Sequence, residues 1–328
     1  MPGFTTHYLF GTDLYQHLTS ERIRKNLKQN HAAFGLGLQG PDLFFYYLPV
    51  YLVSPENPGA LAHSKNTGAF FSSLLESRML FTGNKRDLNI ADAYITGFIG
   101  HYTLDCALHP YVYAFTGYEP EHPLTNLEYF GRHSYFETEI DKELLRQKKN
   151  LSPSRFRQSA TIRLTPVQRR VIRRMLAYAY RTAYPDYKAG KMLPGSAPEW
   201  MQLGTRFFRD PSGRKKVILR FFERLFIGRA FISPMIASDK YCFVKDPLNL
   251  FHRNWMHPWT KETVNTSFPE LYQNALNQYC SRVKNYYRLR SSGFPESQVQ
   301  AFLQEYGNLS FLSGQPCDKV FPTDERIL

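Results

Sequence analysis

Two short patterns in the first half of the chain combine residue types that bind metal ions. The first is His101-x3-Asp105-x3-His109, and the second, which starts 24 residues after His109, is His133-x3-Glu137. Four residues turn an α-helix by about 400° and raise it by about 6 Å, so each spacing stacks its side chains on one stripe of a helix. Imidazole and carboxylate groups suit zinc, and a carboxylate between two imidazoles can be shared by neighbouring ions. The two patterns therefore predict five metal ligands that converge from two helices.

The first pattern lies within the apolar stretch ITGFIGHYTLDCALHPY, which indicates a buried helix. A buried Asp105 beside two imidazoles is costly to desolvate unless a metal ion or a hydrogen-bond partner offsets that cost. A hydrogen-bonded His-Asp-His network in the core is the structural alternative. The presence of a second ligand-bearing helix favours the metal site over that alternative.

Two further segments place single polar residues where they could join the same site. Asp42 follows a Gly/Pro turn in GLGLQGPDLFFY, from which a side chain can project into a cavity, although an aspartate in this position can also be a helix N-cap. His63, in GALAHSKNTGAFF, lies near the start of an expected helix, and an exposed surface histidine is its ordinary alternative. Neither residue is specific on its own.

Taken together and in order, these residues resemble the bacterial zinc-dependent phospholipase C family, which is related in fold to single-strand-specific zinc nucleases. The residues that carry the resemblance are His7, GPD at Asp42, His63, His101-x3-Asp105, His109 and His133-x3-Glu137. The resemblance covers about residues 1–145 well and is weaker over 240–290, in NWMHPW and SFPELYQNAL. It implies an all-α, multi-helix globular bundle with a metal cluster at the base of a cleft.

The resemblance also implies a set of zinc ligands. One ion is expected on Asp42, His63, His101 and Asp105, a second on His109, His133 and Glu137, and a third on His7 with Asp105 shared as a bridge. We therefore expect two or three Zn2+ ions. The implied nucleophile is a metal-activated water, because zinc lowers the pKa of bound water to about 7, and Asp42 is the implied catalytic residue that orients or deprotonates it.

Two departures from the family pattern bear on this assignment. In the secreted members the histidine after the shared aspartate comes six residues later, whereas His109 comes four residues after Asp105. His122 is an alternative second-site ligand, but His109 is preferred because it stays on the helical stripe. The secreted members also use their processed N-terminus on the third ion, and this chain starts without the basic and apolar regions of a signal peptide, which is why the third ion is optional.

The expected reaction is hydrolysis of a phosphodiester, most directly of a phospholipid, to leave a diacylglycerol-like product. A single-strand nuclease is an alternative, because the same metal chemistry serves nucleic acid, and a non-catalytic binding protein stapled by zinc is another. A phospholipid or other phosphodiester is thus the expected partner, and nucleic acid is a less favoured one. An anionic membrane face is a candidate for peripheral contact.

The segments that must position these residues are typical of helices joined by Pro/Gly loops, with little alternation of period two, so an all-α fold is expected. The expected helices lie near 13–30, 60–81, 88–109, 126–147, 165–184, 214–231, 267–290 and 295–307, the later ones with basic outer faces. In the helix near 88–109, Asp87 or Asn89 would cap the start and Pro110 would lie just past the end. The clearest linker is 185–200.

Charge is unevenly distributed along the chain, whose formal net charge is +13. Residues 1–140 carry −4 and residues 141–328 carry +17, with the basic runs RQKK, RRVIRRM and GRKKVILRFFERLF. An acidic segment suits divalent cations, and a basic one suits a phosphate-bearing substrate or an anionic membrane, although a solvated basic surface is the plainer interpretation. We expect one zinc-dependent phospholipase C-like domain over 1–328, with 146–235 a basic helical insertion or extension.

Composition argues against several other classes of protein. An apolar content of 43% over 328 residues can bury a substantial core, so disorder is not expected. The four cysteines form no C-x-x-C pair, which argues against a disulfide framework and against a thiolate zinc site. No stretch approaches the roughly 20 apolar residues of a membrane helix. A cytoplasmic and at most membrane-peripheral location is expected.

Overall fold

The computed structural model of the chain describes residues 3–52, 54, 56–119, 126–187, 196–230, 232–239 and 244–319. Over these residues the regular secondary structure is almost entirely helical, with one antiparallel hairpin of the strands β1 (Trp255–Met256) and β2 (Thr263–Val264). The all-α fold expected from the sequence is confirmed. None of the helices formed by the described residues is long and apolar enough to cross a bilayer.

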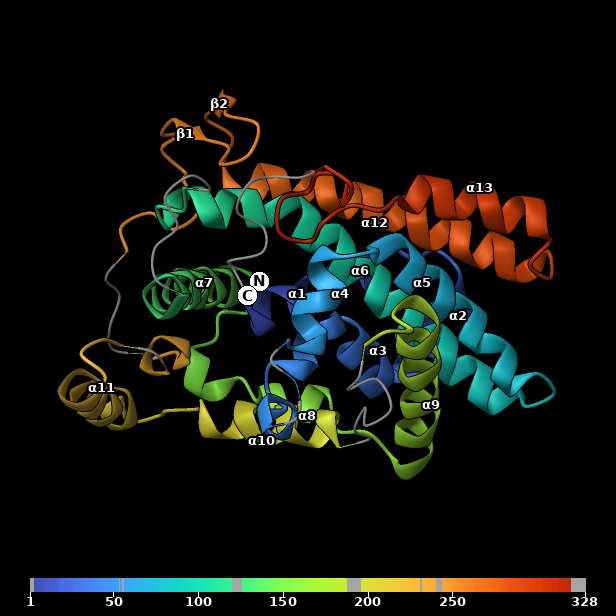
Figure 1. Cartoon of the computed structure of the whole chain (residues 1–328), viewed down its shortest axis with the longest axis horizontal. Coiled ribbons are helices and arrows are strands. Elements are labelled where there is room, and N and C mark those ends of the chain that lie inside the picture. Colours follow the sequence, from blue (N-terminus) through green and yellow to red (C-terminus); the bar gives the residue numbers. More distant parts are fainter. Residues whose placement is uncertain are drawn as a thin grey trace.

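The helices pack around one long central helix. They are α1 (Phe4–His17), α2 (Glu21–Gln29), α3 (His31–Gly37), α4 (Pro58–Ser64), α5 (Thr67–Glu76), α6 (Lys85–Phe115), α7 (Asn126–Lys149), α8 (Gln158–Thr161), α9 (Pro166–Ala183), α10 (Ala197–Phe207), α11 (Arg214–Phe226), α12 (Phe268–Ser291) and α13 (Glu296–Tyr306). The 3-10 segments are η1 (Gly40–Phe44), η2 (Leu48–Leu52), η3 (Ser77–Phe81), η4 (Pro153–Arg155) and η6 (Ser233–Met235). In Figure 1, α6 runs through the middle of the molecule, between α12 and α13 along one edge and α8 and α10 along the opposite edge.

Helix α6 is central because it is apolar on nearly all sides, and its interior residues are almost all buried. It packs against α3, α12, α9, α1 and α7. Its approach to α3 is close: a Cβ added to Gly97 would lie 2.2 Å from the carbonyl oxygen of Phe34, and one added to Gly37 would lie 2.2 Å from that of Tyr94. Glycine at these two positions therefore allows the two helices to meet backbone against backbone.

The two ends of α6 differ from the sequence prediction. Its N-cap is Asn84, whose side chain accepts a hydrogen bond from the N–H of Asp87 at 3.1 Å, so the prediction of Asp87 or Asn89 was wrong. The helix also continues through Pro110 to Phe115. A proline removes one helical hydrogen bond and usually ends a helix, but the residues on both sides of Pro110 are fully buried, and their packing outweighs the lost bond.

Two other predicted helices are divided in the structure. The range 13–30 is broken at residues 18–20, between α1 and α2, and the range 60–81 is broken between α4 and α5, where Asn66 has a φ of +50°. A single left-handed residue interrupts a helix without changing the spacing of the apolar residues, so periodicity did not reveal this break.

The remaining predicted helices agree with α7, α9, α12 and α13 to within a few residues. Both α9 and α12 begin with a capping box, formed by Thr165 with Gln168 and by Ser267 with Glu270. Helix α10 begins inside the predicted linker 185–200, whose residues 188–195 lie outside the described residues. Neither α10 nor the hairpin was predicted.

The basic region 146–235 contains helices of two kinds. Helix α9 places Val171, Ile172 and Met175 in the main core, against α5 and α6. Helix α11, by contrast, buries only the polar residues Lys216 and Glu223, and ends at Phe226 rather than at residue 231.

Candidate metal centre

All eight candidate ligands predicted from the sequence lie close together in the interior. They come from five elements: His7 from α1, Asp42 from η1, His63 from α4, His101, Asp105 and His109 from α6, and His133 and Glu137 from α7. No more than 8% of any of these residues is exposed to solvent. Their ligand atoms form three groups in which all atoms lie within 4.8 Å of one another: His7-His101-Asp105, Asp42-His63-His101 and His109-His133-Glu137.

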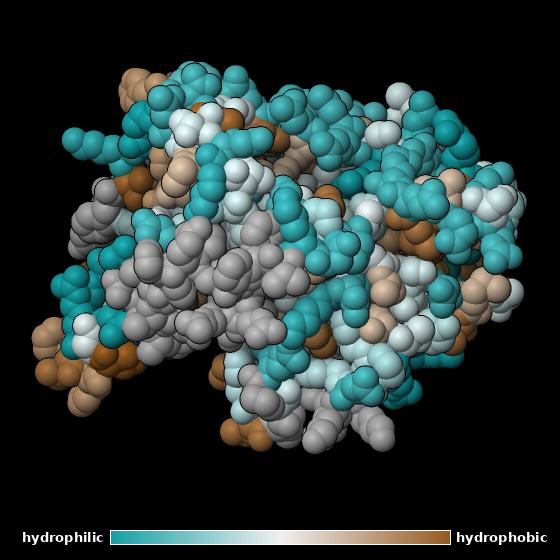
Figure 2. All heavy atoms as spheres, turned by 45° about the horizontal axis from the view of Figure 1, so that its top comes forward, coloured by the Kyte–Doolittle hydropathy of each residue, from teal (hydrophilic) through white to brown (hydrophobic). Residues whose placement is uncertain are grey.

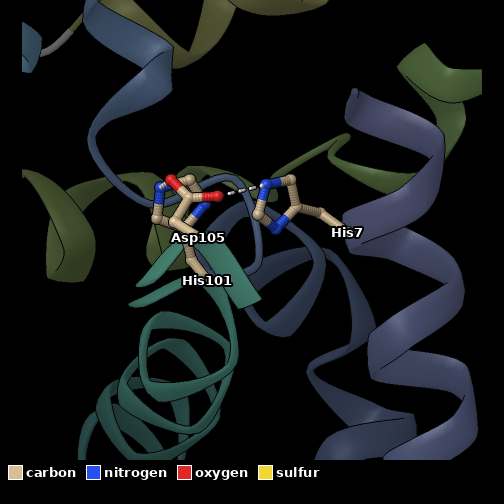
Figure 3. Close-up of side chains that lie close together, drawn as sticks. All are labelled: His7, His101 and Asp105. Atoms are coloured by element: carbon tan, nitrogen blue, oxygen red, sulfur yellow. Dashed lines mark ion pairs between the residues drawn. The ribbon is translucent and has the colours of Figure 1, made fainter. Parts of the chain in front are cut away.

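The carboxylate of Asp105 lies at the middle of the cluster. Its Oδ1 is 3.1 Å from Nε2 of His7, and its Oδ2 is 3.1 Å from Nε2 of His101 (Figure 3). The same Oδ2 is 3.5 Å from Nε2 of His63 and 3.8 Å from Nδ1 of His109. The two oxygens of Asp105 thus face two different groups of imidazoles, which is the arrangement that a bridging carboxylate requires.

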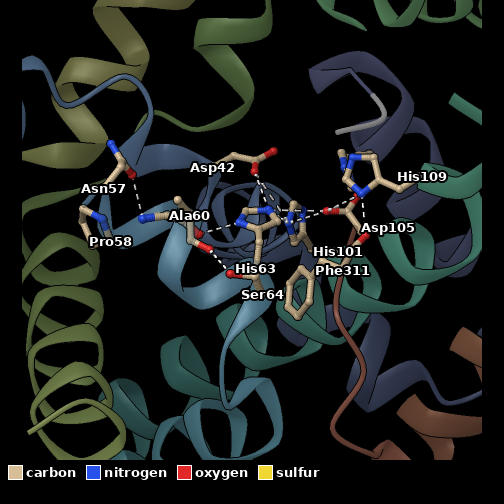
Figure 4. Close-up of polar contacts among 12 residues, drawn as sticks. Asp42, Asn57, Pro58, Ala60, His63, Ser64, His101, Asp105, His109 and Phe311 are labelled. Atoms are coloured by element: carbon tan, nitrogen blue, oxygen red, sulfur yellow. Dashed lines mark hydrogen bonds and ion pairs between the residues drawn. The ribbon is translucent and has the colours of Figure 1, made fainter. Parts of the chain in front are cut away.

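Asp42 reaches this cluster through a turn that needs a glycine. Its Oδ1 lies 3.0 Å from Nε2 of His63 and 3.8 Å from Nε2 of His101, and these two nitrogens are 3.4 Å apart (Figure 4). Gly40, two residues earlier, has a φ of +48°, and a Cβ there would lie 2.1 Å from the ring of His101. A residue with a side chain at this position would push the turn away from α6, so Gly40 lets η1 bring Asp42 to the cluster. Asp42 is inside this short 3-10 segment and is not a helix N-cap.

A second group of candidate ligands lies between α6 and α7. The spacing His133-x3-Glu137 stacks these two side chains on α7, with Nε2 of His133 2.8 Å from Oε1 of Glu137. The same Oε1 is 3.9 Å from Nε2 of His109, which closes the group. His109 therefore reaches α7 despite its short spacing from Asp105. The alternative His122 lies outside the described residues.

Backbone carbonyl oxygens orient three of the imidazoles. The contacts of the ring nitrogens are His63 Nδ1 to the oxygen of Gly59 at 2.6 Å, His101 Nδ1 to that of Leu38 at 3.1 Å and His109 Nδ1 to that of Phe311 at 2.5 Å. A carbonyl only accepts hydrogen bonds, so each Nδ1 carries the proton and each Nε2 presents its lone pair to the cluster. Metal-binding histidines are typically held this way, by a second hydrogen bond that fixes the tautomer.

Three residues that the sequence did not reveal support the cluster. Tyr129 contacts Nδ1 of His133 at 2.8 Å through its hydroxyl group. Asp141 accepts hydrogen bonds from the backbone N–H groups of Thr5 at 2.9 Å and Thr6 at 2.8 Å, and so fixes the start of α1, which carries His7. Tyr129 and Asp141 lie four residues before His133 and four residues after Glu137, on the same stripe of α7. This spacing could have identified them from the sequence.

Phe311, the third supporting residue, gave no such signal. It acts on His109 through a backbone carbonyl, which every residue type has, and it lies about 200 residues farther along the chain. Its N–H also donates to the carbonyl oxygen of His63 at 2.8 Å, so this late segment contacts both parts of the cluster.

The buried polar atoms of the cluster are not satisfied by the described protein groups alone. The atoms that are buried without a conventional hydrogen-bond partner include both ring nitrogens of His7, Oδ1 of Asp42, both carboxylate oxygens of Asp105 and Nε2 of His109. Buried polar groups in folded proteins are nearly always satisfied, so this set of convergent acceptors and imidazole nitrogens fits cations as the missing partners.

The electrostatics of the cluster favour the protonation states that bind metal. Burial favours protonation of Asp105, but the adjacent imidazoles outweigh that effect and hold its pKa well below the usual value. Burial lowers the pKa of His7, and it lowers the pKa of His109 and of His133 well below the usual value. A carboxylate and neutral imidazoles are the forms that ligate a cation.

His63 and Glu137 differ from the rest of the cluster. Burial lowers the pKa of His63, but hydrogen bonds to the carboxylates of Asp105 and Asp42 outweigh it and raise the pKa to about 9. Burial raises the pKa of Glu137 well above its usual value. Both residues hold a proton more firmly than usual in the absence of a cation, so a cation bound beside them would displace protons.

The fold and the cluster together define an all-helical protein whose interior holds three groups of histidine and carboxylate ligands suited to zinc. A model of the zinc-dependent phospholipase C family matches residues 6–187, which is more than half of the chain and includes all eight residues of the cluster. The chain belongs to this family, as the resemblance predicted. No curated protein and no solved structure matches the chain significantly. The matched segment ends before the region 240–290 and before Phe311.

Proposed function

We propose that the protein is a zinc-dependent phosphodiester hydrolase of the phospholipase C type, which cleaves a phospholipid or a related phosphate ester. The observation that carries this proposal is the convergence of three buried ligand groups inside the segment that the family model matches. Zinc held in such a site supplies an activated water and stabilises negative charge on the phosphoryl oxygens.

The ligand assignment follows the contacts within the cluster. We assign Asp42, His63, His101 and Asp105 to one ion, His109, His133 and Glu137 to a second, and His7 with Asp105 to an optional third, as the family resemblance implies. In the geometric groups His101 lies both with Asp42 and His63 and with His7 and Asp105. This assignment is supported by the two oxygens of Asp105, which face His7 on one side and His101 on the other. It uses Nε2 of each imidazole, since Nδ1 of His63, His101 and His109 is engaged by a carbonyl.

We also propose that Asp42 orients the attacking water or accepts its proton. Its carboxylate lies beside His63 and His101, at the edge of the first ligand group, and it reaches that place on the η1 turn rather than on the α6 stripe. A carboxylate placed beside the ligands of a bound cation can serve as a general base.

Residues 1–328 are proposed to form one domain, with 146–235 as its basic helical extension. The shared core supports this arrangement, because α9 from the basic region packs on α5 and α6.

Hydrolysis of short-chain phosphatidylcholine with zinc present tests the proposed activity. Wild type should release the phosphorylated headgroup, and His101→Ala should lower the rate by more than about 100-fold, since losing even an outer partner of a ligand costs about 10–100-fold. His17→Ala is a matched control, because His17 lies on α1 outside the cluster, where its Nδ1 contacts the carbonyl oxygen of Asp13 at 2.8 Å. Equal rates for wild type and His101→Ala would contradict the proposal.

The same preparations distinguish the two alternatives. Release of nucleotides from single-stranded DNA, without cleavage of phosphatidylcholine, would identify a nuclease. Stoichiometric zinc without cleavage of either substrate would identify a binding protein in which the metal is structural, because structural zinc sites have no open coordination position.

A further inference from the structure

Helix α11 presents its apolar side chains to solvent and its polar side chains to the protein. Lys216 and Glu223 on its inner side are only 2% and 4% exposed. Six apolar residues, which we call the α11 apolar face, are 48–77% exposed: Val217, Ile218, Phe221, Phe222, Leu225 and Phe226. A helix on the surface of a globular protein ordinarily has the opposite arrangement, so this face indicates a partner.

Specific hydrogen bonds fix this orientation of α11. The ammonium group of Lys216 donates to the carbonyl oxygen of Ile236 at 2.8 Å. The carboxylate of Glu223 accepts hydrogen bonds from the N–H groups of Ile232 at 2.5 Å and Ser233 at 3.0 Å. Turning the helix to bury its apolar residues would break all of these bonds and leave a buried lysine and glutamate without them. The exposed apolar face is therefore built into the fold.

The surroundings of the α11 apolar face are basic. Arg214 and Arg224 are exposed on the helix itself, and the only acidic residue of α11 is the buried Glu223. Lys215 joins this end of α11 to α10 by donating to the carbonyl oxygen of Phe207, whose side chain is 47% exposed. Figure 2 shows apolar residues gathered at the lower left, the end of the molecule where Figure 1 places α11.

We propose that α11 is an interfacial helix, which lies in the surface of a bilayer and inserts the α11 apolar face between anionic lipids. Its 13 residues span about 20 Å, too short to cross a membrane, and the combination of large apolar side chains with arginines is typical of helices that lie along one. The charge of this face favours a lipid surface over a second copy of the chain. Two copies would bring arginine-bearing faces together and repel each other, whereas anionic lipids would neutralise the arginines.

This surface is distinct from the proposed hydrolytic site and lies outside the segment matched by the family model. The two are connected through α7. The ammonium of Lys216 lies 5.2 Å from the ring centre of Tyr135, which is two residues from both His133 and Glu137 and so points from the opposite side of α7. Helix α7 therefore lies between α11 and the metal centre.

Flotation of the full chain with vesicles tests the proposal. Vesicles of phosphatidylcholine with about 30% phosphatidylserine should bind the protein about tenfold more tightly than vesicles of phosphatidylcholine alone. The double variants Phe221→Ser/Phe226→Ser and Arg214→Glu/Arg224→Glu should each weaken binding to the anionic vesicles by about tenfold. Matched controls are Met79→Ser, which changes another exposed apolar residue, and Lys85→Glu/Arg86→Glu, which makes the same change of charge on α6; both should bind like wild type.

Three results would overturn the proposal. Wild type that does not float with anionic vesicles at 0.1 M salt would exclude it, and so would α11 variants that bind as well as wild type. A dimer in analytical ultracentrifugation that the Phe221→Ser/Phe226→Ser variant dissolves would assign the face to a second copy of the chain. Circular dichroism confirms that each variant is folded. His101→Ala should bind vesicles like wild type, so loss of hydrolysis and loss of docking are separate outcomes.

Discussion

The metal centre and α11 depart from ordinary burial in opposite directions. The centre buries eight ionisable groups among apolar helices, and α11 exposes six apolar side chains. In α11 the buried polar groups have protein partners, such as the carbonyl oxygen of Ile236, and the apolar face is exposed to solvent. In the centre, buried atoms of Asp105 and His7 have no conventional hydrogen-bond partner among the described residues. This difference underlies the two proposals, cations at the metal centre and a lipid surface at α11.

Two aspartates of α6 show the same contrast within one helix. Asp92 and Asp105 are both fully buried. Asp92 is bound by the guanidinium groups of Arg78 and Arg290, each at 2.6 Å, and by the hydroxyl group of Tyr286 at 2.6 Å. Among the described residues, the ion-pair partners of Asp105 are all imidazoles. The chain neutralises Asp92 with its own cations, whereas the surroundings of Asp105 fit a bound cation.

The largest expected effect separates these two aspartates. Asp105→Asn should remove at least one zinc ion per chain and lower the hydrolytic rate by more than about 100-fold, because a neutral amide cannot bridge two cations. Asp92→Asn should leave zinc content and rate unchanged but destabilise the fold by about 3 kcal/mol, because it leaves two half-buried arginines with a weaker partner. For both variants, metal analysis measures the zinc content, initial rates measure hydrolysis and thermal unfolding measures stability. Loss of zinc in Asp92→Asn, or full retention of zinc in Asp105→Asn, would contradict the assignment of Asp105, and not Asp92, to the metal centre.

Removal of metal should have the next largest effect. A ligand present at about 1,000 times its Kd stabilises a fold by about 4 kcal/mol, so a strong chelator should lower the melting temperature by about 10 °C. Calorimetry with and without chelator measures this change, and added zinc should reverse it. Asp105→Asn should respond much less to the chelator. An unchanged melting temperature in chelated wild type would show that the buried carboxylates do not need a cation.

A smaller effect should follow from loosening a ligand rather than removing it. Tyr129→Phe deletes the hydroxyl group that contacts Nδ1 of His133, and it should weaken zinc binding by about tenfold because the imidazole loses the bond that orients it. Competition with a chromophoric chelator measures the affinity. Tyr178→Phe, which deletes an exposed hydroxyl bound to Glu76, is the matched control and should have no effect. Equal affinities for the two variants would place the second ion elsewhere.

The smallest expected effect concerns stability at α11. Phe221→Ser and Phe226→Ser should each change the free energy of unfolding by less than about 0.5 kcal/mol, since the chain does not bury these rings. Phe98→Ala, in buried α6, should cost about 3–5 kcal/mol. Denaturant titration compares the three variants. A cost of several kcal/mol at Phe221 would mean that the chain itself covers the α11 apolar face.

The ligand stripes were predictable because they depend on local geometry and on specific side-chain chemistry. The spacing of His101, Asp105 and His109 determines their common face whenever the segment is helical, and the apolar residues around them indicate that it is buried. The same argument could have identified Tyr129 and Asp141, which continue the stripe of α7.

Features that depend on distant packing were not predictable. The passage of α6 through Pro110 depends on neighbours that bury both sides of the proline, and the contact of Phe311 with His109 depends on a backbone carbonyl. The prediction that the helix over 214–231 has a basic outer face was largely wrong, because most of the exposed residues of α11 are apolar. The 3.6-residue periodicity of this segment correctly separated an apolar face from a polar face, but it did not reveal which of them is buried. The hydrogen bonds of Lys216 and Glu223 with the segment around residues 233–236 bury the polar face.

The most direct test of the metal centre is the zinc content of the purified full chain after reconstitution with zinc and removal of excess metal, measured by mass spectrometry together with Asp105→Asn. We predict two or three zinc ions per wild-type chain and at least one fewer in Asp105→Asn. A wild-type chain that retains no zinc, or an Asp105→Asn chain with the same zinc content as wild type, would contradict the central claim that Asp105 joins a multinuclear zinc site.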